Sequence, residues 1–387
     1  MDFALPDELA EIRAAVRELC LGFPGEYWRG LEPDRYPEEF VRALTENGWL
    51  AALIPEEYGG AGLSLTAASV IMEEINASGC NAGACHAQMY TMGTILRHGS
   101  DEQKRRYLPR IASGELRLQA FGVTEPTAGS DTTAIQTTAT RNGDGWVIHG
   151  QKLWTSRAEH SDLMLLLART TPASEVEKKT LGLSTFLVDM KRAVSAGTLT
   201  IRPIRTLMNH ATTELFLDGV EVDGDDLVGE EGRGFRYILD GMNAERVLIA
   251  AECIGDGRWF VEKARAYASE RVVFGRPIGT NQGVQFPIAQ AHAAIEGADL
   301  MRYKAAWLFE QGRPCGAEAN LAKLLASEAS WAAANACLDT HGGFGFAEEY
   351  DVERKFRETR LYKVAPVSNN LILAYVGQHV LGMPRSY

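Results

Sequence analysis

The spacing of apolar residues changes twice along this chain of 387 residues, and these changes limit the folds that it can adopt. As far as about Glu115, apolar residues recur every three or four positions, which is typical of amphipathic helices. From about Leu118 to Val228, runs rich in Thr, Val, Ile and Leu lie between glycine-containing turns, which is typical of strands. After Gly234 the helical spacing returns and continues to the end. The sequence therefore predicts helices, then a sheet, then helices again.

A chain of this length exceeds the size of one hydrophobic core, so two or three domains, or one large composite unit, are expected, and the three regions indicate the α+β class. We expect an N-terminal helical domain at 1–117, a middle β domain at 118–228 and a C-terminal helical domain at 229–387. In the last domain, long Ala-rich stretches joined by short Gly and Pro connections indicate an antiparallel bundle. In the middle domain, Asn142-Gly143 indicates the turn of a β-hairpin.

Composition excludes several classes of function. A net charge of −12 argues against a nucleic-acid surface, which needs a basic stripe to neutralise phosphates. The six cysteines form no CxxC pair and no histidine lies at metal-ligand spacing, so we expect no metal site and a reducing compartment. The N-terminus carries acidic residues, unlike a secretory or transit peptide, and no apolar run approaches the ~20 residues of a membrane span. We therefore expect a soluble, cytoplasmic protein with no membrane or nucleic-acid partner.

The segment FGVTEPTAGSD, at residues 121–131, concentrates polar groups where the sheet should begin. Backbone N–H groups and hydroxyls in such a loop can cradle phosphates or the polar edge of a ring system. The same composition also suits a tight surface turn, and this loop alone leaves both interpretations open. The chain has no strand–GxGxxG–helix fingerprint of a dinucleotide site, so any nucleotide must be held in another way.

Four segments, in order along the chain, resemble the acyl-CoA dehydrogenase family. FGVTEPTAGSD matches the family's first signature, and KLWTS at 152–156 resembles the strand that lies against the flavin ring. ERVVFG at 270–275, followed by Asn281-Gln282, resembles the segment that reaches the FAD of a neighbouring subunit. HGGFGF at 341–346 matches the second signature, although alone it would also suit the C-terminal cap of a helix. The resemblance covers essentially the whole chain.

This resemblance implies a fold, a cofactor and partners. The family has an N-terminal helical domain, a middle β-barrel-like domain and a C-terminal four-helix bundle, usually in a homotetramer. It implies FAD as cofactor, an acyl-CoA substrate and an electron-transfer flavoprotein as electron acceptor. Asp339 departs from the family, which usually has Gln there, so FAD is expected to be held more weakly or differently. The matching positions imply FAD contacts at Phe121, Val123, Thr124, Trp154, Ser156, Arg271, Phe274, Gln282, Asp339, Gly342, Gly343, Ser368 and Asn370, and substrate contacts at Ser130, Asn243 and Arg246.

The family's chemistry needs a carboxylate that removes the α-proton of the thioester. In most members it lies in a YEGT-like segment, but the matching stretch here, 364–370, has Pro366 in that place. A minority, such as isovaleryl-CoA dehydrogenase, supply it from a helix just before an arginine, and here Glu245 precedes Arg246. Glu245 is therefore our candidate base. The alternative is a surface acid, although the apolar run after Arg246 favours a buried position.

Pro366 also affects the expected binding of the thioester carbonyl oxygen. In the family the backbone N–H at this position contributes a hydrogen bond, and proline has none. The site must lose a donor, recruit another such as the Val367 N–H, or be aligned differently in this segment. Ala365 replaces a frequent Tyr and leaves space for a bulky acyl group or for a short polar one with water. His86 and Tyr90 lie on a helix that lines the acyl pocket in relatives, but core roles suit them equally.

The sequence thus predicts α,β-dehydrogenation of an acyl-CoA of fatty-acid or branched-chain metabolism, in which Glu245 removes the α-proton and flavin N5 accepts the β-hydride. One alternative keeps the fold and changes the reaction to that of an acyl-CoA desulfinase or a flavin oxygenase, which Pro366 invites. Another is a non-catalytic, flavin-bearing relative associated with DNA, since a fold alone does not determine function. The negative charge weighs against the last of these.

Overall fold

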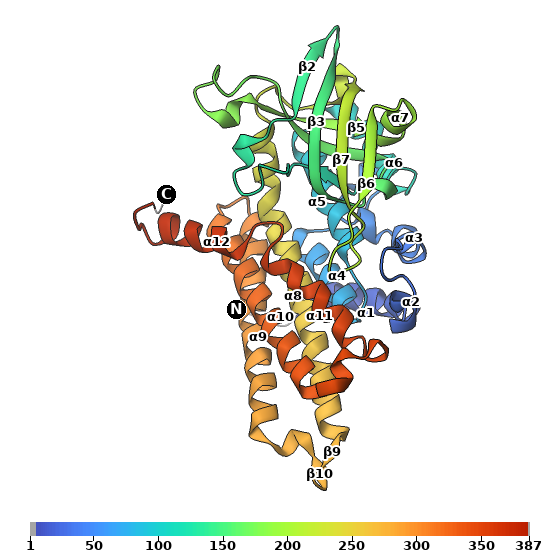
Figure 1. Cartoon of the computed structure of the whole chain (residues 1–387), viewed down its shortest axis with the longest axis vertical. Helices are drawn as coiled ribbons and strands as arrows, with labels where there is room; N and C mark the ends of the chain where they lie inside the picture. Colours follow the sequence, from blue (N-terminus) through green and yellow to red (C-terminus); the bar gives the residue numbers. More distant parts are fainter. Residues whose placement is uncertain (1–4, 386–387) are drawn as a thin grey trace. The chain divides into compact units, whose positions relative to one another are not determined.

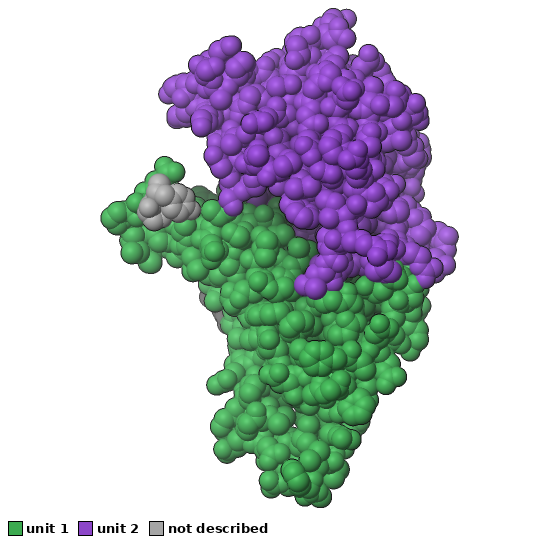
Figure 2. Space-filling view, viewed as in Figure 1, with its two compact units in different colours: residues 1–32, 64–82, 243–387 green, residues 33–63, 83–242 purple. Residues whose placement is uncertain are grey.

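The computed structural model describes residues 5–385 (Figure 1). These residues form two compact units, which Figure 2 colours separately. Unit 1 comprises 5–32, 64–82 and 243–385, and unit 2 comprises 33–63 and 83–242. The order of helices, sheet and helices along the chain is confirmed.

Unit 2 is built on one eight-stranded sheet, in the order β6-β7-β3-β2-β4-β5-β8, with β1 parallel to β4. The predicted hairpin is confirmed: β2 and β3 pair antiparallel, Asn142 lies opposite Gly145, and Gly143 takes the positive φ of 58° that the turn requires. The strands are β1 (Ala120–Gly122), β2 (Thr138–Asn142), β3 (Gly145–Ser156), β4 (Leu163–Arg169), β5 (Leu183–Asp189), β6 (Leu199–Pro203), β7 (Thr212–Val222) and β8 (Leu227–Val228).

Alternating side chains of the sheet form the core of unit 2. In β3, Trp146 and Ile148 point inward and are buried, whereas β4 is buried along its whole length, as expected for a strand covered on both faces. Four helices complete the unit: α3 (Glu38–Glu46), α5 (Gly83–His98), α6 (Asp101–Ala112) and α7 (Met190–Ser195). Ser100 and Gln103 form a capping box at the start of α6, and the Gln103 amide also donates to the Leu227 carbonyl at 2.9 Å.

Unit 1 is helical apart from a short hairpin. Its helices are α1 (Asp7–Leu21), α2 (Gly25–Arg29), α4 (Leu65–Ala77), α8 (Gly234–Glu270, of which the first residues belong to unit 2), α9 (Gln282–Glu310), α10 (Gly316–His341), α11 (Val352–Arg360) and α12 (Asn369–Tyr375), and its hairpin pairs β9 (Val272–Val273) with β10 (Arg276–Pro277). Helices α9 and α10 pack side by side (Figure 1). Gly257 of α8 allows close packing, because a Cβ there would come within 2.8 Å of the Ile295 side chain on α9. None of the described helices combines the length and the apolar character that crossing a membrane requires.

The carboxylate of Glu73 connects four helices within unit 1, namely α1, α4, α8 and α9. Glu73 of α4 accepts hydrogen bonds from Arg13 of α1 at 3.0 Å, from Arg302 of α9 at 2.9 Å and from Arg258 of α8. Arg302 is fully buried and also donates to Asp299. A buried guanidinium needs such anionic partners, since its charge is otherwise costly to remove from water.

We expect Glu73→Gln to lower the free energy of unfolding by about 3–5 kcal/mol, because it leaves buried Arg302 with too little negative charge. Glu262→Gln is a matched control on the exposed side of α8, where Glu262 pairs with Arg265, and should cost under about 1 kcal/mol. Urea unfolding followed by circular dichroism measures both. Equal midpoints for the two variants would contradict the importance of the shared carboxylate.

Candidate functional site

The carboxylate of Glu125 organises the segment 121–131. Glu125 is 5% exposed and accepts hydrogen bonds from the backbone N–H groups of Gln136 at 2.6 Å and Thr137 at 2.9 Å. The ammonium of Lys152 donates to it at 2.8 Å. Burial opposes the ionisation of Glu125, but Lys152 and these hydrogen bonds outweigh burial and lower its pKa. The loop is therefore held by a charged, buried anchor.

Lys152 connects this loop to strand β3. Its side chain is fully buried, and its ammonium also donates to the Val123 carbonyl at 3.1 Å. Burial lowers the pKa of Lys152 to about 8, although the negative charge of Glu125 acts in the opposite direction. Beside it, the Leu153 N–H donates to the Thr124 carbonyl at 2.8 Å. These contacts hold Val123 and Thr124 against β3.

The predicted flavin residues of unit 2 come together through this arrangement. Phe121, Val123 and Thr124 are half-buried where β1 ends, and Ser156 is half-buried at the end of β3. Trp154 interrupts the pairing of β3 with β7, takes a φ of 61° and is 56% exposed. A large aromatic side chain held outward in a strained backbone conformation offers a flat surface for a planar ring.

Two further aromatic groups extend from Phe121 into helix α5. The ring centroid of Tyr90 lies 5.4 Å from that of Phe121, and the ring of His86 lies 5.1 Å from that of Tyr90, both in edge-on geometry. Ser130, the predicted substrate contact, lies exposed further along the same loop. Half-buried Phe121 and Tyr90 thus join the loop to α5, with buried His86 packed against Tyr90.

Asn243, Glu245 and Arg246 lie within one turn of helix α8. Arg246 donates to the Asn243 amide oxygen at 3.1 Å, whereas its Nε is buried without a hydrogen-bond partner among residues 5–385. Burial lowers the pKa of Arg246, and the charge of Glu245 acts in the opposite direction. Glu245 is 4% exposed and is therefore not a surface acid. A buried N–H without a protein partner suits a polar ligand atom.

The segment 364–370 follows helix α11. Pro366 and Asn370 are exposed, and Ser368 is half-buried and caps the N-terminus of α12 by accepting from the Leu371 N–H at 3.4 Å. From α10, Lys323 donates to the Val367 carbonyl at 2.8 Å. No described side chain of this segment is acidic, as the sequence already implies.

The remaining predicted FAD residues lie in unit 1, in the hairpin after α8, at the start of α9 and around the C-terminal end of α10. All are exposed: Arg271, Phe274, Gln282, Asp339, Gly342 and Gly343. The Arg271 guanidinium lies 5.7 Å from the ring centroid of Phe344, which brings Arg271 to the glycine pair. Gly342 ends α10 with a φ of 57°, so the role of a helix cap also holds. A Cβ at either glycine would meet no atom within 4 Å, so the backbone here is open to close approach.

The chemistry of these surfaces fits FAD. Trp154 provides an exposed flat aromatic face, and Thr124 and Ser156 carry hydroxyls on the adjoining loop and strand; a planar ring with a polar edge suits this set of groups. Arg271 and the open backbone at Gly342 and Gly343 suit the charge of a diphosphate.

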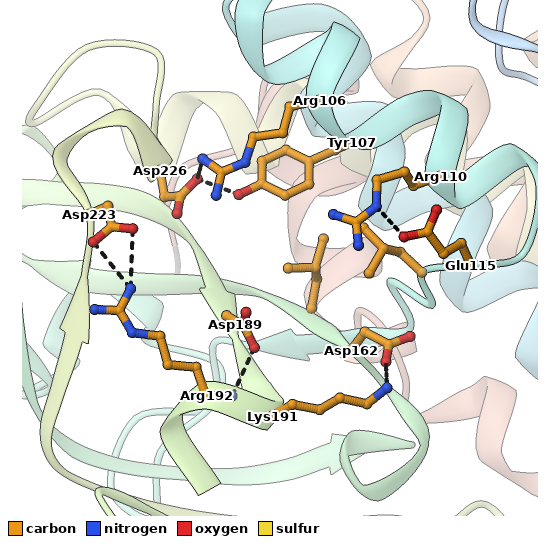
Figure 3. Close-up of a pocket in the computed structure, with 12 residues that line it drawn as sticks. Arg106, Tyr107, Arg110, Glu115, Asp162, Asp189, Lys191, Arg192, Asp223 and Asp226 are labelled. Atoms are coloured by element: carbon orange, nitrogen blue, oxygen red, sulfur yellow. Dashed lines mark hydrogen bonds and ion pairs between the residues drawn. The ribbon is translucent and has the colours of Figure 1, made fainter. Parts of the chain in front are cut away.

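A cavity of about 350 Å³ elsewhere in unit 2 shows a different chemistry (Figure 3). Charged side chains line it, and none of the predicted site residues does. They pair across the cavity or beside it, joining Arg106 to Asp226, Arg110 to Glu115, Lys191 to Asp162 and Arg192 to Asp223. Most of the charged side chains of this cavity are thus engaged in ion pairs, whereas the predicted site presents the exposed indole of Trp154.

Sequence reasoning did not single out Glu125, Lys152 or Lys323, which hold the segments of the site in place. A signal for Lys152 exists, because it shares the inward phase of β3 with buried Ile148. Lys323 lies among alanines on the buried side of α10, where a charged residue is unexpected. A lysine at a position that the periodicity predicts to be buried therefore indicates a residue that anchors a site.

We expect Lys152→Met to lower the free energy of unfolding by about 3–5 kcal/mol and to reduce flavin binding, because it leaves the Glu125 carboxylate buried without its cation. The double variant with Glu125→Gln should recover part of this loss. Lys191→Met is the control, since Lys191 is exposed and pairs with Asp162 at the surface. Urea unfolding and flavin absorbance measure the effects. A Lys152→Met variant as stable as the control would exclude the anchor.

Comparisons with known proteins agree over the whole length. Sequence models of the acyl-CoA dehydrogenase family match the chain: the N-terminal domain at 6–115, the middle domain at 120–220 and the C-terminal domain at 232–381. Acyl-CoA dehydrogenase FadE12 of Mycobacterium tuberculosis is 36% identical over 391 residues, covering 100% of this chain and 99% of that protein. A glutaryl-CoA dehydrogenase of Desulfococcus multivorans is 35% identical over 398 residues, covering 100% of both.

A solved structure agrees with these sequences. The glutaryl-coenzyme A dehydrogenase in complex with glutaryl-CoA has a TM-score of 0.92 and 33% identity, covering 100% of this chain and 98% of that one. Its similarity extends across both helical regions and the sheet, because it covers the chain from end to end. The chain therefore belongs to the acyl-CoA dehydrogenase family and is an FAD-dependent oxidoreductase.

Proposed function

We propose that the protein catalyses the α,β-dehydrogenation of an acyl-CoA thioester with Glu245 as the base. The observation that carries this proposal is the burial of Glu245 on α8, next to an arginine whose Nε has no hydrogen-bond partner in the described part of the chain. Pro366 occupies the other position at which family members carry a base, so one carboxylate is left for the task. We place the protein with the subgroup that resembles isovaleryl-CoA dehydrogenase on this ground.

The proposed reaction depends on a carboxylate kept away from water. An α-proton of a thioester is a weak acid, so its removal needs a base at hydrogen-bond distance and stabilisation of the negative charge on the carbonyl oxygen. Glu245 takes the proton, and Asn243 and Arg246 contact the thioester ligand. FAD, when bound, accepts the hydride from the β-carbon. The exposed Trp154 and the hydroxyls of Thr124 and Ser156 orient the ring.

The carbonyl oxygen needs a donor that Pro366 cannot supply, since proline has no N–H. We assign this role to the backbone N–H of Val367, the next residue. The small side chain of Ala365 leaves room for a branched, cyclic or aromatic acyl group, or for a short polar one with water. The identity of the acyl group is therefore a question for substrate screening by anaerobic bleaching of the flavin.

A second candidate reaction rests on Pro366 and Ala365. A site without the usual loop carboxylate also suits the cleavage of a substituent by a desulfinase or the addition of oxygen by a flavin oxygenase. Product mass discriminates among them, because dehydrogenation removes two hydrogens from the acyl group. Binding to DNA as a non-catalytic relative is disfavoured by the charge of −12.

We propose an electron-transfer flavoprotein as electron acceptor and a homotetramer as the assembly. Helix α9 supports association, because Phe286, Leu300 and Trp307 expose at least half of their side chains. Phe274 is fully exposed, although the resemblance assigns it to the FAD of a neighbouring subunit. We also propose the domain division at 1–117, 118–228 and 229–387, and a cytoplasmic location, which the six cysteines support because none of them forms a disulfide.

We expect Glu245→Gln to lower kcat by about 1,000-fold while FAD content stays unchanged, because the amide cannot accept the α-proton. Glu262→Gln on the exposed side of the same helix is the control and should leave kcat unchanged. Steady-state turnover with an artificial electron acceptor and flavin absorbance give the two readouts. Turnover of the Glu245→Gln variant within a few-fold of the wild type would refute the assignment of the base.

We expect the wild type to sediment as an oligomer of the 42.4 kDa chain and Leu300→Glu to shift it towards the monomer, because a charge in a buried contact is costly. FAD content should fall with the oligomer, since Arg271 and Phe274 are assigned to a neighbour's cofactor. Val194→Glu on α7 is the matched control. Analytical ultracentrifugation with flavin absorbance measures both. A wild-type monomer saturated with FAD would contradict this assembly.

A further inference from the structure

Lys323 of α10 is a fully buried ammonium whose hydrogen-bond acceptors are neutral. It donates to the Val367 carbonyl and to the Asn369 side-chain oxygen, both at 2.8 Å. A buried lysine normally has a carboxylate partner, because a charge without one is costly to bury. Burial lowers the pKa of this ammonium to about 8. Because burying this ammonium without a bonded carboxylate is costly, we infer that Lys323 has a role other than general stability.

The acceptors of Lys323 belong to the segment in which Pro366 replaces the loop carboxylate. The Asn369 amide donates to Ser327 at 3.1 Å and to Glu328 at 2.8 Å, both one turn further along α10. Lys323, Ser327 and Glu328 thus hold Asn369 from one helix. Since the Val367 carbonyl is held as well, the backbone from 366 to 369 is fixed to α10 at two points.

Lys323 also lies within electrostatic reach of the proposed base. The charged and titratable groups that act on its ammonium are Cys253, Arg246 and Glu245 from α8 and Glu328 from α10. Glu328 is shared with Lys363, which donates to it at 2.7 Å. The ammonium of Lys323 therefore contacts the segment 366–369 directly and is also subject to the charge of Glu245.

We propose that Lys323 is a positioning residue for proton removal: it holds the backbone of 366–369 so that this backbone supplies the donor for the thioester oxygen that Pro366 lacks. This inference rests on the proposed function. It explains why α10 carries a buried cation here. An apolar residue of similar length would fill the space but would leave the Val367 carbonyl without its donor.

The test separates enolisation from oxidation. The substrate probe is 3,3-dimethylbutyryl-CoA, which has α-protons but no β-hydrogen, so its α-protons can exchange with D2O although no hydride can leave. Mass spectrometry follows the exchange on the FAD-loaded enzyme. Lys323→Met should lower both this exchange and the kcat of a true substrate by about 100-fold, with KM changed by less than about 3-fold and FAD content unchanged.

Lys363→Met is the matched control, because it removes another ammonium that bonds to α10 from the chain just before this segment. It should leave the exchange unchanged. If Lys323→Met does not fold, Asn369→Ala removes one of the two acceptors while leaving the lysine in place, and should lower the exchange by about 10-fold.

The outcomes keep this proposal distinct from the proposed function. If the wild type exchanges, Glu245→Gln does not, and Lys323→Met or Asn369→Ala exchanges like the wild type, the role of Lys323 is refuted and the base stands. If the wild type neither exchanges the α-protons of the probe nor oxidises any acyl-CoA, the proposed dehydrogenation and the role of Lys323 are both refuted. A loss of exchange in Lys323→Met that Lys363→Met does not share supports the positioning role.

Discussion

A buried ion pair determines whether the polar loop before the sheet can act as a site. Lys152 and Glu125 lie in different segments and are bonded to each other at 2.8 Å; Lys152 also donates to the Val123 carbonyl, and Glu125 also accepts from the Gln136 N–H. Without this pair, the loop has the composition of an ordinary surface turn. With it, Phe121, Val123 and Thr124 have a fixed place relative to β3, and Trp154 projects from a rigid strand.

Buried charged groups also fix segments in unit 1. Glu73 connects helices through ion pairs, and Lys323 holds the segment 366–369 through charged hydrogen bonds. Buried charges of this kind are poor sources of net stability, because their desolvation offsets most of the attraction. Their value lies in geometry, since an ion pair or a charged hydrogen bond permits few arrangements, whereas apolar contacts tolerate many. A reaction that depends on donors placed to within fractions of an ångström needs that restriction.

The elements of the fold were predictable because their signals are local. Period-two runs and the Asn142-Gly143 turn depend on neighbouring residues, and the apolar run after Arg246 predicted that Glu245 is buried. The exposure of Trp154 was not predictable, because it follows from an irregularity in the pairing of β3 with β7. The partners of Lys323 lie 44 and 46 residues away, and no local pattern connects them.

The position of the base and the sequence 364–370 are physically connected. Two carboxylates in one dry site repel each other, and one would retain a proton and be lost as a base. Because Glu245 on α8 is the base, a second acid at position 366 would be a disadvantage. The loop at 364–370 therefore does not need a carboxylate. A loop without the base still has to present a donor to the thioester oxygen. Its backbone then needs an external anchor, and Lys323 supplies one from the neighbouring helix.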